Sequence, residues 1–521
     1  MPGPPSWLEA LHRPDAYPHP TAAIRLVETH LSWVVLTGDW AYKLKKPIAL
    51  GFVDFSTLDK RKACCEEELR LNRRTVPGIY DDVVTLVQTG SGPRFDKQGD
   101  VLEYAVRMHQ FPQSDVLLSI TDSGRLTPSQ IEQLAHSIAA MHASAAVAPE
   151  NSPFGKPATV RRYTEGCLPP VAAAISPDQA PKLDSLTRWV QEEATRLDQH
   201  FADRRQAGFI RECHGDLHLG NIVLVDGVPQ PFDCIEFNAE LRFIDVVSDL
   251  AFIFMDLVDH ERPGSAWQLL NGWLTTTGDF SGLAALRYYV VYRALVRAKV
   301  AAIRLTQAGL TPNDIADTRK LLAGYLELAD RQSRTTGHGL ILMHGLSGSG
   351  KSCVARTLSL ELGAVCIRSD VERKRNLASR ATAGVSELYS GAAISDVYRR
   401  MLDPAAAILR AGLPVIVDAT FLEMSHRLQF QRLADELGVP WALVTCEAPE
   451  SVLEQRVQKR RSEGGDPSDA TLEVLRLQRS SAAPLSATEI PRTHRCETSG
   501  AVDQVRLAAA VRSLLAFGAT A

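Results

Sequence analysis

The 521-residue sequence contains no long hydrophobic run. Its most apolar stretch, residues 246–258, is interrupted by Asp249 and Asp256 and is shorter than the roughly 20 apolar residues that span a bilayer. The N-terminal segment MPGPPSWLEALHRPDAYPHP breaks each apolar run with proline or a charged residue, so it does not have the pattern of a signal peptide. We therefore expect a cytoplasmic protein that does not contact membranes.

Cysteine pairs and blocks of positive charge are also missing. Nine cysteines occur without a CxxC pair, which argues against a structural zinc site and favours free thiols in a reducing compartment. The formal charge of −4 divides into about −6 for residues 1–336 and about +2 for the remainder. Because nucleic-acid binding needs concentrated positive charge, we expect small-molecule partners. Local arginine clusters leave nucleic acid open for the C-terminal part.

The length and the change of pattern along the chain predict two domains. A domain usually has about 100 to 200 residues, so one core is not expected. Residues 25–48 alternate like antiparallel strands, and a mainly helical pattern runs from Pro128 to residue 333. After residue 336, short apolar runs alternate with amphipathic helices, which predicts a parallel sheet. We predict an α+β domain at 1–335, with a small β lobe and a mainly helical lobe, and an α/β domain at 336–521.

A glycine-rich phosphate-binding motif follows the strand expected at 340–344. The sequence GLSGSGKS at 345–352 is a complete GxxxxGK[ST], placed between a strand and a helix as the motif requires. Its backbone N–H groups can surround phosphates, the lysine can reach the β and γ oxygens, and the last serine can bind Mg²⁺. The alternative is a chance glycine turn. The predicted ATP-binding residues are Gly345, Ser347, Gly348, Ser349, Gly350, Lys351 and Ser352.

Acidic and basic residues farther along complete this expected site. Asp370 closes the second predicted strand and can accept a proton from an attacking hydroxyl, with Arg373 one helical turn later. Asp418 ends the strand VIVD at the ligand-binding edge of the sheet and can help to hold Mg²⁺. Arg456 and Arg460 lie at helical spacing before the flexible SEGGDPSD, which suggests a lid that neutralises phosphate charge. A solvated helix face is the alternative for these arginines.

Together these segments resemble the small P-loop kinases, such as gluconate kinase, zeta toxin and phage polynucleotide 5'-hydroxyl kinase. The resemblance covers most of residues 340–478. It implies that Asp370 is the base for a hydroxyl acceptor and that Arg373 holds acceptor or phosphate. Acceptors differ across that group, and the sequence favours none of them.

A second motif, HGDLHLGN at 214–221, predicts another phosphoryl-transfer site. Asp216 can orient an acceptor hydroxyl, while Asn221 and Asp233 supply the amide and carboxylate that hold Mg²⁺ on ATP phosphates. A polar hairpin turn, or a pair of histidines that bind metal, is the alternative. The pattern strongly resembles the aminoglycoside phosphotransferase and choline kinase families, relatives of protein kinases. That resemblance implies a bracing role for His214.

A kinase-like β lobe also needs a strand lysine paired with a helix glutamate. Lys43 and Lys45 share one strand face, and we expect Lys43 to pair with Glu68; an edge strand carrying solvated lysines is the alternative. No GxGxxG loop precedes Lys43. Arg242, Asp245 and Asp249 resemble residues downstream of the metal site in this family, for which structural ion pairs are at least as good an explanation.

The whole arrangement resembles bacterial fusions of an aminoglycoside phosphotransferase with an ATP-binding kinase. We expect an ATP-dependent and Mg²⁺-dependent phosphotransferase that acts on hydroxyl groups of small molecules. In one alternative, the N-terminal domain is a pseudokinase or ligand-binding module that regulates the C-terminal kinase. In another, the C-terminal domain is a polynucleotide 5'-hydroxyl kinase.

Overall fold

The computed structural model describes residues 5–50, 53–307, 309–334, 337–378, 391–463 and 470–516. The chain forms two compact units, one from residues 1–163 and 198–256 and the other from residues 164–197 and 257–521. The expected boundary residues Thr335 and Thr336 and most of the expected lid segment, 464–469, lie outside the described residues. The division into domains at 1–335 and 336–521 stays a prediction, since compact units and fused domains need not coincide.

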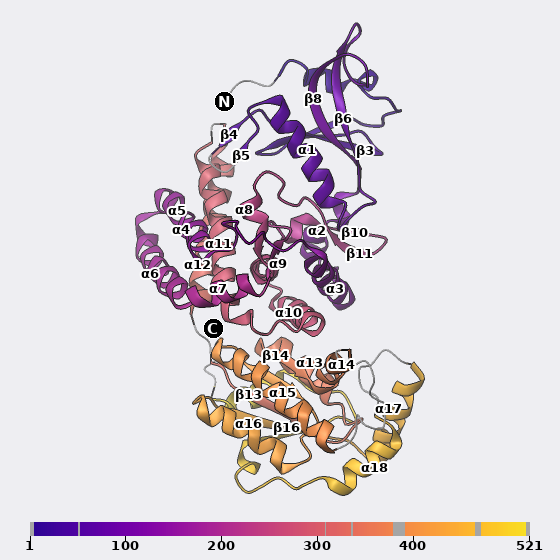
Figure 1. Cartoon of the computed structure of the whole chain (residues 1–521), viewed down its shortest axis with the longest axis vertical. Coiled ribbons are helices and arrows are strands. Elements are labelled where there is room, and N and C mark those ends of the chain that lie inside the picture. Colours follow the sequence, from indigo (N-terminus) through magenta and orange to yellow (C-terminus); the bar gives the residue numbers. More distant parts are fainter. Residues whose placement is uncertain are drawn as a thin grey trace. The chain divides into compact units, whose positions relative to one another are not determined.

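A six-stranded antiparallel sheet with one helix against it carries the lysines of the first unit (Figure 1). Its strand order is β1-β2-β3-β8-β6-β7. The strands are β1 (Arg25–Glu28), β2 (Ser32–Leu36), β3 (Trp40–Lys45), β6 (Tyr80–Thr89), β7 (Gly92–Phe95) and β8 (Asp100–His109). Helix α1 (Leu58–Asn72) packs on β6 and β8.

Both faces of this sheet are buried, which explains how β3 can carry two lysines. Tyr42 and Leu44 pack with the N-terminal segment on one face, whereas Ala41 packs with Cys65 of α1 on the other. Because side chains alternate along a strand, Lys43 and Lys45 share the face of Ala41 and point toward α1.

The rest of the first unit is mainly helical, as expected for this region, and it contains one irregular segment. Outside that segment, this part of the unit contains the hairpin of β4 (Ala49–Leu50) and β5 (Val53–Asp54) and the helices α2 (Leu117–Asp122), α3 (Pro128–Ser144), α7 (Asp198–Gln206) and α8 (Ala239–Arg242). Helices α4 (Pro157–Glu165) and α9 (Val246–Asp259) lie mostly in this unit. The irregular segment contains β9 (Ile210–Glu212), β10 (Ile222–Val225), β11 (Val228–Pro231) and β12 (Phe243–Asp245).

The second unit contains a five-stranded, all-parallel sheet in the order β14-β15-β13-β16-β17. The strands are β13 (Leu340–His344), β14 (Val365–Arg368), β15 (Val415–Asp418), β16 (Trp441–Glu447) and β17 (Thr493–Glu497). This confirms the predicted α/β fold. Each of the three central strands is a short, buried apolar run, as parallel strands covered by helices require.

Helices accompany this sheet along the chain (Figure 1). They are α13 (Lys351–Leu362), α14 (Ser369–Ala378), α15 (Gly391–Arg410), α16 (Met424–Glu436), α17 (Glu450–Glu463), α18 (Leu472–Ser481) and α19 (Gln504–Leu514). The same unit includes α5 (Leu168–Ala174), α6 (Ala180–Arg196), α10 (Pro263–Thr277), α11 (Leu283–Leu305) and α12 (Pro312–Ser333).

One predicted position in this sheet is wrong. Asp370 does not close a strand, because β14 ends at Arg368 and Asp370 lies in the first turn of α14. An acidic side chain there interacts favourably with the positive end of the helix dipole.

None of the helices in the described part of the chain has the length and apolar character needed to cross a membrane.

Candidate functional sites

The hairpin β10–β11 brings the expected metal ligands of the first unit together. Ile222 pairs with Pro231, so Asn221 and Phe232 face one another beyond the end of the ladder, and the Phe232 N–H donates to the Asn221 carbonyl at 2.9 Å. Asp233 follows directly. The Asn221 amide nitrogen donates to the Asp216 carboxylate at 3.1 Å and to its carbonyl at 3.0 Å. Backbone pairing therefore places Asp216, Asn221 and Asp233 in one loop cluster.

This cluster fits a magnesium ion by the chemistry of its donors. Asn221 uses its amide nitrogen for Asp216, so its amide oxygen is the atom that can serve as a metal ligand. Carboxylate and amide oxygens are the ligands that Mg²⁺ prefers. The Asp233 carboxylate is 38% exposed, which leaves it accessible from solvent.

The lysines of β3 connect this loop cluster to helix α1. The Lys43 ammonium lies 2.7 Å from Glu68 Oε1 and also binds the Asp233 carboxylate. Lys45, which is 1% exposed, binds Glu68 and Glu236. Both lysines thus contact Glu68, and only Lys43 contacts the expected metal ligand. Lys43 remains our candidate for the nucleotide-binding lysine.

The charged groups in this network shift one another's pKa values. Burial would lower the pKa of Lys43, but Asp233 and Glu68 outweigh burial and raise it well above its usual value. Burial would raise the pKa of Glu68, whereas the two lysines hold it at about 2. Burial raises the pKa of Glu236 despite Lys45. Glu236 was not predicted from the sequence, where its only signal is its place three residues after Asp233.

His214 braces the loop that contains Asp216, as the resemblance implied. Its Nε2 lies 2.8 Å from the Phe232 carbonyl, and its Nδ1 lies 3.3 Å from the Asp216 backbone nitrogen. A carbonyl can only accept, so the contact with Phe232 places a ring proton on Nε2. Burial would lower the pKa of His214, but Cys234 and Asp249 outweigh burial and raise it to about 9. His218 Nε2 lies 3.4 Å from the Asp216 carboxylate.

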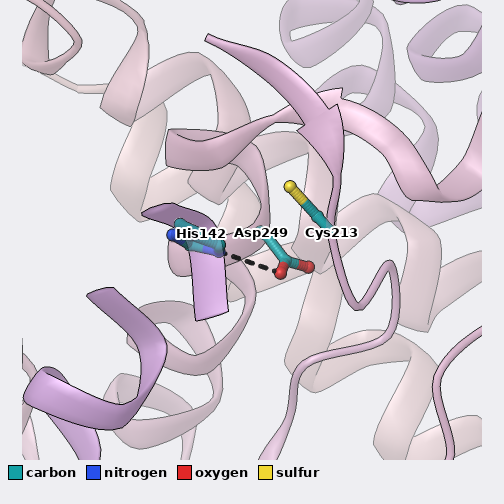
Figure 2. Close-up of side chains that lie close together, drawn as sticks. All are labelled: His142, Cys213 and Asp249. Atoms are coloured by element: carbon teal, nitrogen blue, oxygen red, sulfur yellow. Dashed lines mark hydrogen bonds and ion pairs between the residues drawn. The ribbon is translucent and has the colours of Figure 1, made fainter. Parts of the chain in front are cut away.

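His142, Cys213 and Asp249 form a buried cluster behind this loop (Figure 2). Their ligand-type atoms lie within 4.8 Å of one another, a geometry that a metal ion could use. The Asp249 carboxylate, however, accepts the backbone N–H groups of His214 at 3.0 Å and Gly215 at 2.9 Å, and it lies 3.1 Å from His142 Nε2. These contacts favour a brace for the loop over a metal site.

The neighbouring charged residues also make structural pairs. Asp245 binds Arg204 at 2.7 Å, and both side chains are at most 2% exposed. Arg242 binds Glu67 at 2.6 Å and Glu212 at 3.2 Å. For Arg242 and Asp245, the contacts therefore favour the ion-pair interpretation, whereas Asp249 has a structural role through backbone N–H groups.

In the second unit, the GxxxxGKS segment forms the turn between β13 and α13. Gly345, Gly348 and Gly350 all have positive φ, at +136°, +82° and +83°. A Cβ at Gly345 would lie 2.5 Å from the Cys446 carbonyl, and one at Gly348 would lie 2.8 Å from the Leu453 carbonyl. Glycine is required at both places for conformation and for space.

The expected catalytic side chains of the second unit lie around this turn. The Lys351 ammonium donates to the Leu346 carbonyl at 2.8 Å. Burial lowers the pKa of Lys351, and the nearby carboxylates of Asp418 and Asp370 oppose this. Burial raises the pKa of Asp418, while a hydrogen bond from Ser352 lowers it. Ser352 therefore lies close enough to Asp418 to lower its pKa, which suits a shared magnesium ion.

The expected arginines take different positions. Arg373 binds Asp370 at 3.0 Å, one helical turn apart as predicted. Arg456 donates to the carbonyls of Gly348 at 3.3 Å and Thr498 at 2.5 Å. Arg460 lies close enough to Lys351 to lower its pKa. Arg456 therefore braces the phosphate loop, and the phosphate-neutralising roles of Arg456 and Arg460 stay predictions.

Gln478 also contacts this loop, and nothing in the sequence indicated that contact. The Gln478 side-chain oxygen on α18 accepts the Ser347 backbone N–H at 2.9 Å. An amide of the expected phosphate cradle is thereby occupied by a side chain from α18.

Comparison with known proteins finds two protein families in this chain. The model of the phosphotransferase enzyme family matches residues 98–289, and that of the AAA domain family matches residues 340–485. Uncharacterized proteins of Mycobacterium tuberculosis and Mycobacterium bovis are 31% identical to this chain over 497 residues, which cover 93% of this chain and 95% of each relative. The chain belongs to the same family as these mycobacterial proteins.

The chain therefore joins a phosphotransferase domain to a P-loop domain, and it is of the kinase type. Solved structures add no argument, because their TM-scores are low. A kinase from Chloroflexus aurantiacus aligns with a TM-score of 0.29 and 20% identity over 35% of this chain and 100% of its own. Amicoumacin kinase hAmiN aligns with a TM-score of 0.39 and 15% identity over 62% of this chain and 91% of its own.

Proposed function

We propose that the chain is a kinase with two ATP sites, each of which transfers a γ-phosphoryl group to the hydroxyl of a small molecule. The observation that carries the first site is the Lys43 ammonium between Glu68 and Asp233, beside the hydrogen-bonded pair of Asp216 and Asn221. The corresponding observation for the second site is that Asp418 and Asp370 lie close enough to Lys351 to oppose the lowering of its pKa by burial.

At the first site, Asp216 orients the acceptor hydroxyl and takes its proton as the oxygen attacks. The new bond joins the acceptor oxygen to the γ-phosphorus, and the bond from the γ-phosphorus to the β–γ bridging oxygen breaks to release ADP. Lys43 binds phosphate oxygens. Asn221 and Asp233 would hold Mg²⁺, which neutralises the phosphate charge when bound.

At the second site, Asp370 takes the equivalent proton, and Arg373 orients its carboxylate through their 3.0 Å contact. The backbone N–H groups of the GxxxxGKS turn and Lys351 bind the phosphates. Ser352 and Asp418 would hold Mg²⁺ there. Since the two sites use separate residues, a substitution can inactivate either site without changing the residues of the other.

Nucleotide stoichiometry tests this proposal. The full chain should bind two equivalents of a non-hydrolysable ATP analogue with Mg²⁺, measured by calorimetry. Lys351→Ala and Asp233→Asn should each leave one equivalent, and the double variant none. Lys46→Ala is the matched control, because Lys46 pairs with Glu28 away from both sites, and it should keep two. A wild-type chain that binds fewer than two equivalents would contradict the proposal.

A second candidate makes the first site a ligand-binding module without kinase activity. The turn between β1 and β2 favours it, because its residues Thr29, His30 and Leu31 include no glycine that could approach phosphates closely. This candidate expects one equivalent of nucleotide in the wild type, abolished by Lys351→Ala and unaffected by Asp233→Asn.

A further inference from the structure

Asp233 has a backbone conformation that is uncommon for residues other than glycine. Its φ is +64°, in the left-handed region where a side chain crowds the backbone. Such strain persists only when the surroundings hold it, and it is frequent at functional sites. The contacts around Asp233 therefore show which residues keep its carboxylate beside Asn221 and Lys43.

The backbone of residues 232–235 is held at each position. His214 binds the Phe232 carbonyl through its ring at 2.8 Å and the Ile235 N–H through its own carbonyl at 3.1 Å. The two central N–H groups are bound by side chains from outside the loop. Tyr80 Oη accepts the Asp233 N–H at 3.2 Å, and Asn72 Oδ1 accepts the Cys234 N–H at 2.9 Å.

These two side chains come from the β lobe and are themselves fixed. Asn72 lies at the end of α1, one helical turn after Glu68, and is fully buried. Its amide nitrogen donates to the Glu68 carbonyl at 2.8 Å, which orients its oxygen toward Cys234. Tyr80 begins β6 and is 2% exposed. Helix α1 therefore contacts Lys43 through Glu68 and the Asp233 loop through Asn72.

We propose that Asn72 and Tyr80 are positioning residues that hold Asp233 in the left-handed conformation needed for metal binding. This inference rests on the proposed magnesium role of Asp233. Because Glu68 and Asn72 both lie on α1, this helix fixes the position of the Lys43–Glu68 pair relative to Asp233. Loss of either hydrogen bond lets Asp233 leave this conformation, so more Mg²⁺ is required, while the lysine still binds nucleotide.

The test uses the full chain carrying Lys351→Ala, so that nucleotide binding reports the first site alone. Tyr80→Phe removes only the acceptor oxygen, and Asn72→Ala removes the second contact. Each should raise the Mg²⁺ concentration for half-maximal binding of an ATP analogue about three- to ten-fold, as expected for one lost hydrogen bond. Binding without Mg²⁺ should stay within about two-fold of the parent. Tyr104→Phe on the adjacent strand β8 is the matched control and should change neither value.

The possible outcomes distinguish failure of the positioning role from failure of the proposed first site. An unchanged Mg²⁺ requirement in folded Tyr80→Phe overturns the positioning role, as does an equal loss of binding with and without Mg²⁺. A Lys351→Ala parent that shows no magnesium-dependent nucleotide binding overturns the proposed first site and this inference with it. Tyr80→Phe keeps the buried ring, so it remains informative if Asn72→Ala does not fold.

Discussion

Arg427 and Glu489 form an ion pair in which Nε lies 2.7 Å from Oε1 and each side chain is at most 1% exposed. The same guanidinium donates to the carbonyls of Phe421 at 3.0 Å and Pro484 at 2.9 Å. It therefore ties the segment after Asp418 to the segment before β17. Burial would raise the pKa of Glu489, but Arg427 helps to hold it at about 2.

Replacing one partner of this pair should be strongly destabilising, because it leaves an uncompensated buried charge. Arg427→Leu should lower the free energy of unfolding by about 3 to 5 kcal/mol. Hydrogen exchange of β15 peptides across a urea series measures the change. The double variant Arg427→Leu/Glu489→Leu should lose less than the sum of the two single variants. Additive losses would mean that the two charges do not depend on each other.

Gln478 should compete with nucleotide for the phosphate loop, since its oxygen occupies the Ser347 N–H. Gln478→Ala should tighten ATP-analogue binding about three- to ten-fold, the equivalent of one hydrogen bond that nucleotide no longer has to displace. Calorimetry on the full chain carrying Asp233→Asn isolates this site.

The control for that measurement is Gln458→Ala on the exposed face of α17, which should leave the affinity unchanged. Weaker binding by Gln478→Ala would instead indicate that the Gln478 amide helps to bind the phosphates.

Local sequence predicted the parts of these sites that depend on neighbouring residues. The GxxxxGKS turn follows from glycine spacing between a strand and a helix, and the spacing of Arg373 from Asp370 is one helical turn. The parallel sheet follows from short apolar runs between helices. Even the Lys43–Glu68 contact could be proposed, because strand alternation and helix order restrict the choice of partners.

Contacts between distant segments could not be predicted in this way. Tyr80 and Asn72 lie 153 and 162 residues from the backbone groups they bind, and Gln478 lies 131 residues from Ser347. Tyrosine, asparagine and glutamine are common in structural positions, so their types carry no signal. Arg456 was assigned from its charge and its helical spacing with Arg460, whereas its contacts with Gly348 and Thr498 arise only when α17 packs beside the GxxxxGKS loop.

Gly215 in the catalytic loop should tolerate no side chain. Its φ is +87°, and a Cβ would lie 2.9 Å from the Leu241 carbonyl. Gly124 is the matched control, since its φ is +70° but a Cβ there meets nothing within 4 Å. Gly124→Ala should cost about 1 kcal/mol from conformation alone.

Gly215→Ala should cost about 1 to 3 kcal/mol more than Gly124→Ala, because overpacking adds to the conformational strain. It should also weaken nucleotide binding at the first site, whereas Gly124→Ala should not. Hydrogen exchange of β10 peptides and calorimetry in the Lys351→Ala chain measure the two effects. Equal losses in both variants would show that the loop relaxes around the new methyl group.

His344 should make the second unit sensitive to mild acid. Burial, with smaller contributions from Arg427 and Lys351, lowers the pKa of His344 to about 4, against an ordinary value of 6.5. The unfolded chain therefore takes up its proton at a higher pH than the folded chain. Above pH 6.5 the neutral ring is present in both states, and as the pH falls from 6.5 to 4 stability is lost, by about 3 kcal/mol for a shift of this size.

His344→Gln should flatten this loss, because glutamine does not titrate. Urea midpoints for exchange of β13 peptides, taken at pH 7.5 and pH 4.5, give the slope for each protein. The comparison at pH 7.5 serves as the control for packing, since His344 is neutral there in both folded and unfolded chains. Slopes that are parallel in the two proteins would show that other groups cause the acid sensitivity. A steeper slope in the wild type would assign it to this one buried imidazole at the end of β13.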